Sequence, residues 1–186
     1  MEMQSLYERK RTSVREALRR IRRGGRIFLG SGCAEPTLLS KGLTENAHLF
    51  ADNPVIHILT MGEAAYTQSE YSDHFRLNAL FIGPNVRDAV NEGRADYTPV
   101  FLSEVPALFS SGQIPLEAAL VSVSPPDDEG FCTLGVSVDV VRAATENARI
   151  VIAEVNPNLP RTHGDTQIHL DQIDALVEND APILEW

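Results

Sequence analysis

The chain has 186 residues, of which 43% are hydrophobic, and a formal net charge of −10. This length suffices for one cored domain without disulfides, and the two cysteines, Cys33 and Cys132, lack the spacing of a disulfide framework or a structural zinc site. Nine of the sixteen Lys and Arg residues lie between Arg9 and Arg26, so the rest of the chain is acidic. That distribution argues against a nucleic-acid binder. Because no run reaches membrane-span length and no apolar signal core begins the chain, we expect a soluble cytoplasmic protein without a membrane partner.

The apolar pattern predicts alternating strands and short helices along the whole chain. In chain order we expect a helix from 14 to the glycines at 24 and 25, a strand at 26–30, a helix at 36–46, strands at 55–60 and 75–82, a short helix ending at 92, a strand at 97–101, a helix at 103–111, a strand at 119–123, a helix at 137–146 and a strand at 149–155. Residues 156–165 read as a loop, 166–170 as extended chain, and 171–178 as a short helical turn or connector. This alternation predicts an α/β fold, a mostly parallel open sheet with helices on both faces, in one domain.

The chain is organised around the stretch from Ala119 to Asp139. An apolar run to Val123 breaks into Ser124-Pro125-Pro126, three acidic residues and Gly130. The prolines prevent the strand from continuing, so residues 124–135, here called the arch, must leave the sheet at its carboxyl edge, where open α/β sheets build sites. Amides and hydroxyls near Gly130, Gly135 and Ser137 suit an anion or a developing oxyanion. The alternative is a proline-stiffened turn in which Ser137 caps a helix.

A second candidate is the turn after the first predicted strand, Gly30-Ser31-Gly32. Its glycines let backbone amides approach a ligand closely, although the sequence is neither a Walker loop nor GxGxxG, and Ser31 does not lie in a GxSxG elbow. His57, expected in the middle of a strand, is either a site residue or a hydrogen-bonded core histidine.

A rival metal site is conceivable at His163, Asp165 and His169. Together with Asp171 these residues fall at even offsets, so in an extended segment all would point to one side. Gly164 and the nearby prolines argue against a straight strand, and no further cluster supports the site. We therefore expect no metal.

Four segments together resemble the acetyl-CoA hydrolase/transferase family, in particular its branch of 4-hydroxybutyrate and butyrate–acetate CoA-transferases. They are CAEP from Cys33 to Pro36, PVFLSEVPALF from Pro99 to Phe109, VSPPDDEGFCTLGVSVD from Val123 to Asp139, and AEVNPNLPRTHGDTQIH from Ala153 to His169. The resemblance extends over nearly the whole chain. It implies a fold related to sugar-phosphate isomerases and a chain that is the N-terminal domain, with 155–186 as a connector to a C-terminal catalytic domain.

The resemblance also implies a mechanism. In the family a glutamate attacks an acyl-CoA thioester and passes through a glutamyl-CoA thioester to a carboxylate acceptor. That glutamate belongs to the second domain, so the resemblance assigns no catalytic residue to this chain, and Glu35, Glu63, Glu129 and Glu154 are not taken as nucleophiles.

What the resemblance places here is a wall of the substrate pocket, with coenzyme A entering as the acyl-CoA substrate. The expected substrate-binding residues are Ser31, Gly32, His57, Ser124, Pro125, Gly130 and Gly135. The expected partners are the C-terminal domain, an acyl-CoA, a short-chain carboxylate and further copies in a homo-oligomer. Alternatives are an acyl-CoA hydrolase of the same family, a metal-dependent hydrolase using His163, Asp165 and His169, and a non-catalytic binding module.

Overall fold

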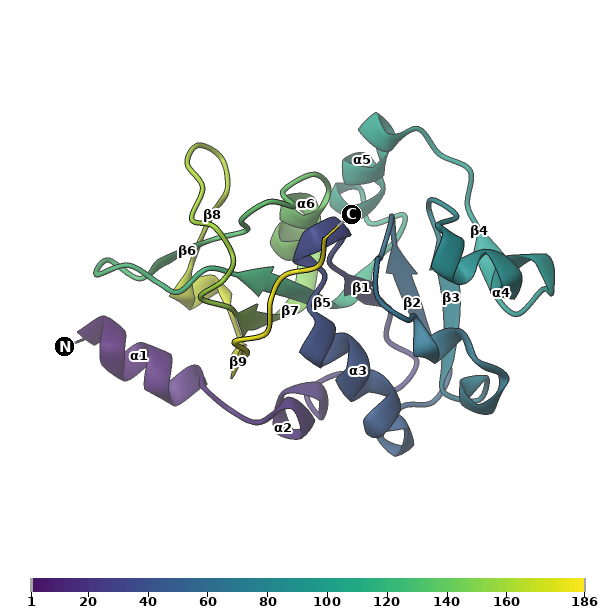
Figure 1. Ribbon diagram of the computed structural model, residues 1–186, viewed down its shortest axis with the longest axis horizontal. Helices are drawn as coiled ribbons and strands as arrows, with labels where there is room; N and C mark the ends of the chain where they lie inside the picture. The colour runs from purple at the N-terminus through teal and green to yellow at the C-terminus, as the bar shows by residue number, and fades with distance from the viewer. Residues whose placement is uncertain (1, 186) are drawn as a thin grey trace.

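The computed structural model of the chain describes residues 2–185 and is built on one open sheet of seven parallel strands (Figure 1). The strand order is β4-β3-β2-β1-β5-β7-β9. The strands are β1 (Ile27–Leu29), β2 (Asn53–His57), β3 (Phe75–Ala79), β4 (Asp96–Tyr97), β5 (Leu116–Val123), β7 (Ala148–Val155) and β9 (Ala175–Glu178). The predicted parallel α/β sheet is confirmed.

The connections between strands carry short helices, as expected for parallel pairs. The α-helices are α1 (Glu2–Lys10), α2 (Val14–Leu18), α3 (Thr37–Glu45), α4 (Arg87–Asn91), α5 (Val105–Ser110) and α6 (Val141–Asn147). Single 3₁₀ turns are η1 (Gly32–Ala34), η2 (Ala47–Leu49), η3 (Ala65–Thr67), η4 (Ser69–Tyr71), η5 (Pro84–Val86), η6 (Leu102–Glu104) and η7 (Leu170–Gln172). Within residues 2–185, no helix combines the length and apolar character needed to cross a bilayer.

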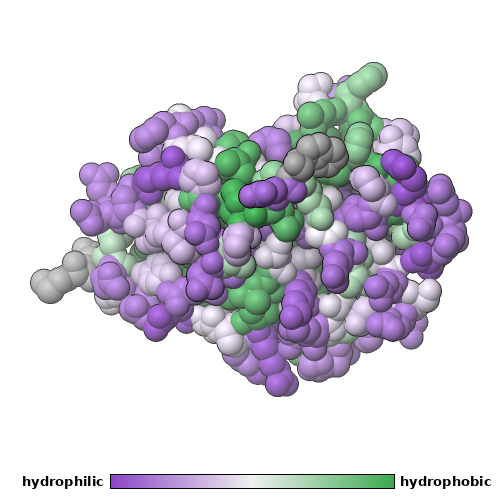
Figure 2. Space-filling view, viewed as in Figure 1, coloured by the Kyte–Doolittle hydropathy of each residue, from purple (hydrophilic) through white to green (hydrophobic). Residues whose placement is uncertain are grey.

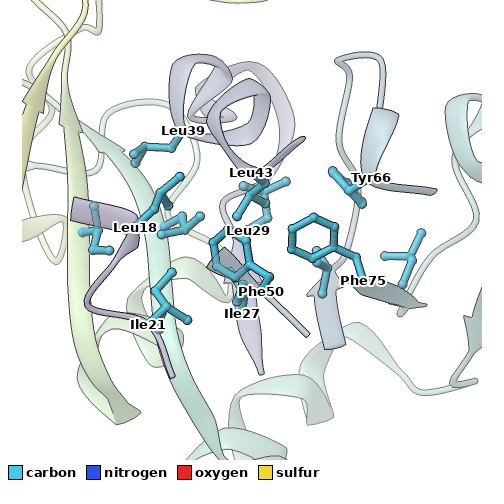
Figure 3. Packing of buried hydrophobic residues seen from close by; sticks show 14 of the residues in the cluster. Leu18, Ile21, Ile27, Leu29, Leu39, Leu43, Phe50, Tyr66 and Phe75 are labelled. Carbon is cyan, nitrogen blue, oxygen red and sulfur yellow. The ribbon is translucent and has the colours of Figure 1, made fainter. Parts of the chain in front are cut away.

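Two apolar layers cover the two faces of the sheet. Because side chains alternate along a strand, Ile27 and Leu29 of β1 enter one layer and Phe28 enters the other. The first layer is closed by α2 and α3, and Figure 3 shows Leu18, Leu39 and Leu43 of these helices around the strand residues. The second layer is closed by α5 and α6. Helices on both faces are therefore confirmed.

A two-stranded antiparallel ribbon lies beyond the carboxyl edge of the main sheet. It pairs β6 (Phe131–Thr133), which lies inside the arch, with β8 (Gln167–His169). The extended segment predicted at 166–170 is thus confirmed, whereas the strand inside the arch was not predicted. Three-residue strands carry too little pattern to be recognised without their partner.

Residues 171–178 differ from the prediction of a helical turn or connector. After η7 the chain forms β9, which pairs with β7 in parallel register and makes the edge of the main sheet. The part of the expected connector 155–186 that spans 167–178 is therefore built into the two sheets. Burial of Ala175 and Leu176 against both layers explains the strand.

Other strand predictions had wrong bounds. The strand expected at 75–82 ends at Ala79, and the strand expected at 119–123 begins at Leu116. The strand expected at 97–101 pairs only over Asp96–Tyr97, because Pro99 has no N–H to donate to a ladder. The strand expected at 55–60 begins two residues earlier and ends at His57, so this histidine terminates β2 and does not lie in its middle.

Helix ends also differ from the prediction. The first predicted helix is α2, which is capped by Ser13 and ends at Leu18, because the amides of Arg20 and Ile21 bond three residues back. The helix expected from Ser137 starts at Val141. Helix α1 was not predicted, since its sequence is mostly polar; it is held by Lys10, whose ammonium donates to the carbonyls of Leu170 (2.6 Å) and Ile173 (2.5 Å).

Candidate functional site

The order in which the chain adds strands to the sheet reverses at β1. The chain adds β2, β3 and β4 on one side of β1 and β5, β7 and β9 on the other, so the strand order has a switch point between β1 and β5. Ligands of open α/β sheets bind at such a switch point. Both predicted candidates, the Ser31–Gly32 turn and the arch, leave the sheet at this edge.

Ser31 is joined to the start of α6 beside this switch point. Its hydroxyl donates to Oδ2 of Asp139 at 2.7 Å, and only 3% of Ser31 is exposed. The other carboxylate oxygen of Asp139 accepts the amides of Val140 and Val141. Asp139 thus performs the capping that was expected of Ser137, and it connects the first turn of α6 to the turn after β1.

Gly32 continues the same contact. Its φ of +61° lies in the left-handed region, and its amide donates to the carbonyl of Leu59 after β2 at 2.8 Å. A Cβ atom here would lie 3.1 Å from the hydroxyl oxygen of Ser137. Ser137 in turn accepts the amide of Ala34 at 3.4 Å. The predicted glycine turn is therefore packed directly against the residues that follow the arch.

The arch is an ordered excursion closed at its base by Ser124. The hydroxyl of Ser124 accepts the amide of Thr133 at 3.0 Å, and the Ser124 amide donates to the Thr133 carbonyl at 2.9 Å. At the tip, Asp127 accepts the amide of Phe131 at 2.8 Å and pairs with Arg161. Burial of Ser124, at 1% exposure, makes it a support of the arch.

Gly130 and Pro125 lie on the outer side of the arch. Gly130 has a φ of +88°, and a Cβ there would meet Met3 of α1 at 2.7 Å and His169 of β8 at 2.9 Å. Pro125 is exposed and, with Tyr7 of α1, lines two neighbouring grooves. These two predicted residues therefore face α1, while Ser31 and Gly32 face Ser137 and Asp139.

Gly135 is required by the packing where the chain returns from the ribbon. Its φ is +62°, and a Cβ would lie 2.4 Å from Cγ of the buried Leu159. Gly135→Ala is therefore expected to lower the free energy of unfolding by about 2 kcal/mol, through left-handed strain and a clash.

Chemical denaturation of Gly135→Ala beside Gly112→Ala checks that prediction. Gly112 has a φ of +74° with nothing within 4 Å of a Cβ, so its variant carries the strain alone. Equal losses in the two variants would contradict the role given to Leu159.

His57 is buried at the carboxyl end of β2. It has 0% exposure, its ring centroid lies 6.3 Å from that of Tyr66, and neither ring nitrogen hydrogen-bonds to another of the described residues. Burial lowers the pKa of His57 to about 4, so the ring is neutral in the folded chain at neutral pH. His57 therefore lies in the core, as one alternative expected, but it lacks, among the described residues, the hydrogen bonds that this alternative gave it.

Two buried glutamates at the same edge were not predicted as site residues. Glu35 accepts the amides of Met61 (2.8 Å) and Gly62 (2.7 Å), and Glu154 of β7 accepts those of Leu38 and Leu39 at the start of α3, both at 3.0 Å. Burial is the main cause that raises the pKa of both carboxyl groups. A lone glutamate inside the apolar run of β7 was the available signal for Glu154.

The rival metal cluster is not assembled. Asp165 pairs with Arg142, and the ring of His169 contacts the carbonyl of Glu129 at 3.1 Å and the amide of Asp171 at 3.2 Å. Only residues from Gln167 onward are in a strand, so the even offsets do not put His163 and Asp165 on the face of His169. From Glu2 to Glu185, no group of three or more His, Cys, Asp or Glu side chains is placed to hold a metal ion.

The doubly wound parallel sheet, with its switch point between β1 and β5, is typical of ligand-binding α/β domains. Comparison with known proteins narrows the class. Residues 1–185 match the family described as acetyl-CoA hydrolase/transferase N-terminal domain, and the chain belongs to this family. The resemblance inferred from the sequence is confirmed.

Individual relatives agree with this assignment. The chain is 43% identical over 185 residues to a 4-hydroxybutyrate coenzyme A transferase of Clostridium kluyveri, covering 100% of this chain and 43% of the relative. RipA of Yersinia pestis superposes with a TM-score of 0.90 at 28% identity, covering 100% of this chain and 46% of RipA. A 4-hydroxybutyrate CoA-transferase of Porphyromonas gingivalis gives 0.84 at 31% identity, covering 98% and 42%. The chain thus spans less than half the length of these relatives.

Proposed function

We propose that this chain is the N-terminal domain of a short-chain acyl-CoA:carboxylate CoA-transferase. The observation that carries the proposal is similarity to a 4-hydroxybutyrate coenzyme A transferase along the entire chain, at 43% identity. The contact between the Ser31 turn and the start of α6, at the carboxyl edge of the sheet, gives the proposal a location. The acyl group is taken to be acetate, butyrate or 4-hydroxybutyrate, and coenzyme A enters as the thioester substrate.

In the proposed reaction the nucleophile comes from outside this chain. A glutamate carboxylate attacks the thioester carbonyl. The C–S bond then breaks, the CoA thiolate departs, and an acyl-glutamyl anhydride is formed. The thiolate then attacks the glutamyl carbonyl, which releases the donor acid and leaves a glutamyl-CoA thioester; the acceptor carboxylate reverses these steps. Dividing one exchange in this way avoids a single high barrier.

The contribution of this chain is to hold one wall of the pocket in place. The Ser31–Asp139 bond and the Gly32–Leu59 bond connect the turns after β1 and β2 to α6. Carboxylates are weak nucleophiles, so the orientation of the acyl group against the attacking oxygen supplies much of the rate. A rigid wall is what this orientation needs.

Exposed apolar side chains at the same edge suit the docking of a second domain. Phe101 is 76% exposed, Leu102 60% and Phe81 54%. Figure 2 shows apolar surface over α5 and the segment that leads into it. Apolar patches of this kind mark interaction surfaces. We propose that the C-terminal domain covers this region.

The proposal is tested with the protein expressed from its full reading frame. Butyryl-CoA and acetate should yield acetyl-CoA and butyrate, and free CoA should accumulate slowly. Rapid release of free CoA, independent of acetate, would identify a hydrolase of the same family. Absence of both products, with a range of acyl-CoA donors and carboxylates, would favour a binding module.

Ser31→Ala is expected to lower kcat/KM of that protein by about tenfold, because the turn after β1 loses its bond to Asp139. Steady-state kinetics with butyryl-CoA and acetate measure the effect. Ser110→Ala, at the exposed end of α5, is the matched control and should leave kcat/KM unchanged. Equal kinetics for the two variants would remove Ser31 from the site.

We further propose a cytoplasmic, homo-oligomeric protein. Size-exclusion chromatography with light scattering measures the oligomeric state of the full-length product. A monomer at micromolar concentration would contradict this part of the proposal.

A further inference from the structure

The turn after β2 is hydrogen-bonded by side chains on two sides. It leads from Thr60 through Met61 to Gly62 and lies beside the Ser31–Gly32 turn, because the amide of Gly32 donates to the carbonyl of Leu59 at 2.8 Å. The sulfur atoms of Cys33 and Met61 are 3.7 Å apart. The turn is therefore an immediate neighbour of the proposed pocket wall.

Glu35 holds the N–H side of this turn. One carboxylate oxygen, Oε2, accepts both the Met61 amide at 2.8 Å and the Gly62 amide at 2.7 Å. Glu35 is 4% exposed and follows η1 directly, so its backbone moves with the turn after β1. A Cβ on Gly62 would lie 2.8 Å from the other carboxylate oxygen, so a larger residue there would displace the Glu35 carboxylate.

Asn85 holds the opposite side. Its side-chain amide donates to the carbonyl of Gly62 at 2.9 Å and to the hydroxyl of Thr60 at 3.0 Å. Asn85 belongs to η5, which follows β3, so the contact reaches the turn from a third strand end. The peptide units on both sides of Gly62 are thus fixed by side chains from two different elements.

This arrangement includes two features that lower the stability of the fold. The Oδ1 atom of Asn85 is buried without a partner among the described residues, and the residue after Glu63, Ala64, has a φ of +48°. Unpaired buried acceptors and left-handed non-glycine residues each destabilise a fold, and such features gather at functional sites.

We infer that Glu35 and Asn85 are positioning residues for the acyl pocket, which act by clamping the Thr60–Gly62 turn against the Ser31–Gly32 turn. The inference rests on the proposed function and deepens it. Neither side chain needs to touch the substrate. Each sets where the backbone of Met61 and Gly62 lies relative to the acyl group.

The test uses Glu35→Ala, Asn85→Ala and the double variant in the full-length protein, with butyryl-CoA and acetate. Each single change should lower kcat/KM by about 10- to 100-fold, since a displacement near 1 Å has this effect on orientation. The kcat/KM of the double variant should be no lower than that of the less active single variant, because both residues act through one turn. Glu35→Gln keeps an acceptor oxygen and should stay within about threefold of the unmodified protein.

Asn53→Ala is the matched control. Asn53 is 0% exposed and donates to the carbonyls of Arg22 (2.8 Å) and Gly25 (2.7 Å), but at the opposite end of β2. It should lower the melting temperature and leave kcat/KM within about threefold at temperatures where the protein is folded. If Glu35→Ala does not fold, the kcat/KM values of Asn85→Ala and Gly62→Ala are compared with that of Asn53→Ala instead.

Hydrogen exchange at the Met61 and Gly62 amides distinguishes a wrong clamp from a wrong positioning role and from a wrong proposed function. Faster exchange in the variants together with unchanged kcat/KM would overturn the positioning role, as would multiplicative losses in the double variant. Unchanged exchange would overturn the clamp itself. An unmodified protein that transfers no CoA, yet shows the exchange pattern, would overturn the proposed function and with it the role in positioning an acyl group.

Discussion

Glu154→Ala is expected to lower the free energy of unfolding by about 3–5 kcal/mol, because it leaves several buried donors without an acceptor. Glu154 is 1% exposed; one oxygen accepts the amides of Leu38 and Leu39, and the other accepts the side chain of Asn179 at 2.5 Å. The residue therefore ties the first turn of α3 and the chain after β9 to strand β7. Chemical denaturation measures the loss.

Glu154→Gln provides the comparison. It keeps an acceptor for the two helix amides, but it places an amide against the Asn179 side chain, whose own oxygen already accepts the Ala181 amide at 3.0 Å. The expected loss is about 1 kcal/mol. Glu146→Ala, on the exposed side of α6, should stay within about 0.5 kcal/mol of the unmodified chain. A loss for Glu154→Ala no larger than that of Glu146→Ala would contradict the role of Glu154.

The second large effect is acid destabilisation through His57. The pKa of this buried ring is about 4 when folded, against 6.5 for an exposed histidine. As pH falls below 6.5 the unfolded chain binds a proton that the folded chain does not. Stability is therefore lost between pH 6.5 and 4, by about 3 kcal/mol in total, and the contribution is constant below that range.

Comparison with His57→Phe isolates this contribution. The raised pKa values of Glu35 and Glu154 act in the opposite direction, because protonation of these carboxyl groups favours the folded chain as pH falls. They are common to both proteins, so the difference in unfolding free energy between them should change with pH only through His57. A difference that stays flat from pH 7 to pH 4 would contradict the buried, neutral state.

Much of the sheet could be predicted because five of its strands are apolar runs that end in glycine, proline or polar residues. The elements that the sequence did not reveal depend on distant partners. Strands β6 and β8 are three residues each and exist through one another, and β9 is stabilised by its place beside β7. Helix α1 has little apolar pattern of its own and is held by contacts with η7.

The positions of the turns at the candidate site were predicted for the same reason. Glycines and prolines indicate where the chain must turn, so the Ser31–Gly32 turn and the arch were found in the correct places at the carboxyl edge. Asp139, Glu35 and Asn85 were missed because their roles come from pairing across the fold, which local sequence does not display. His57 was expected within a strand, but whether it faced a ligand or the core depended on the layer covering β2.

The most direct test of the central claim is to locate the covalent intermediate. The full-length protein is incubated with butyryl-CoA, treated with hydroxylamine, and digested for peptide mass spectrometry, so that a glutamyl thioester is recorded as a hydroxamate. We predict that the labelled glutamate lies outside residues 1–186. A hydroxamate on Glu35, Glu63, Glu129 or Glu154 would show that this domain supplies the nucleophile itself and would contradict its assignment as one wall of a shared active site.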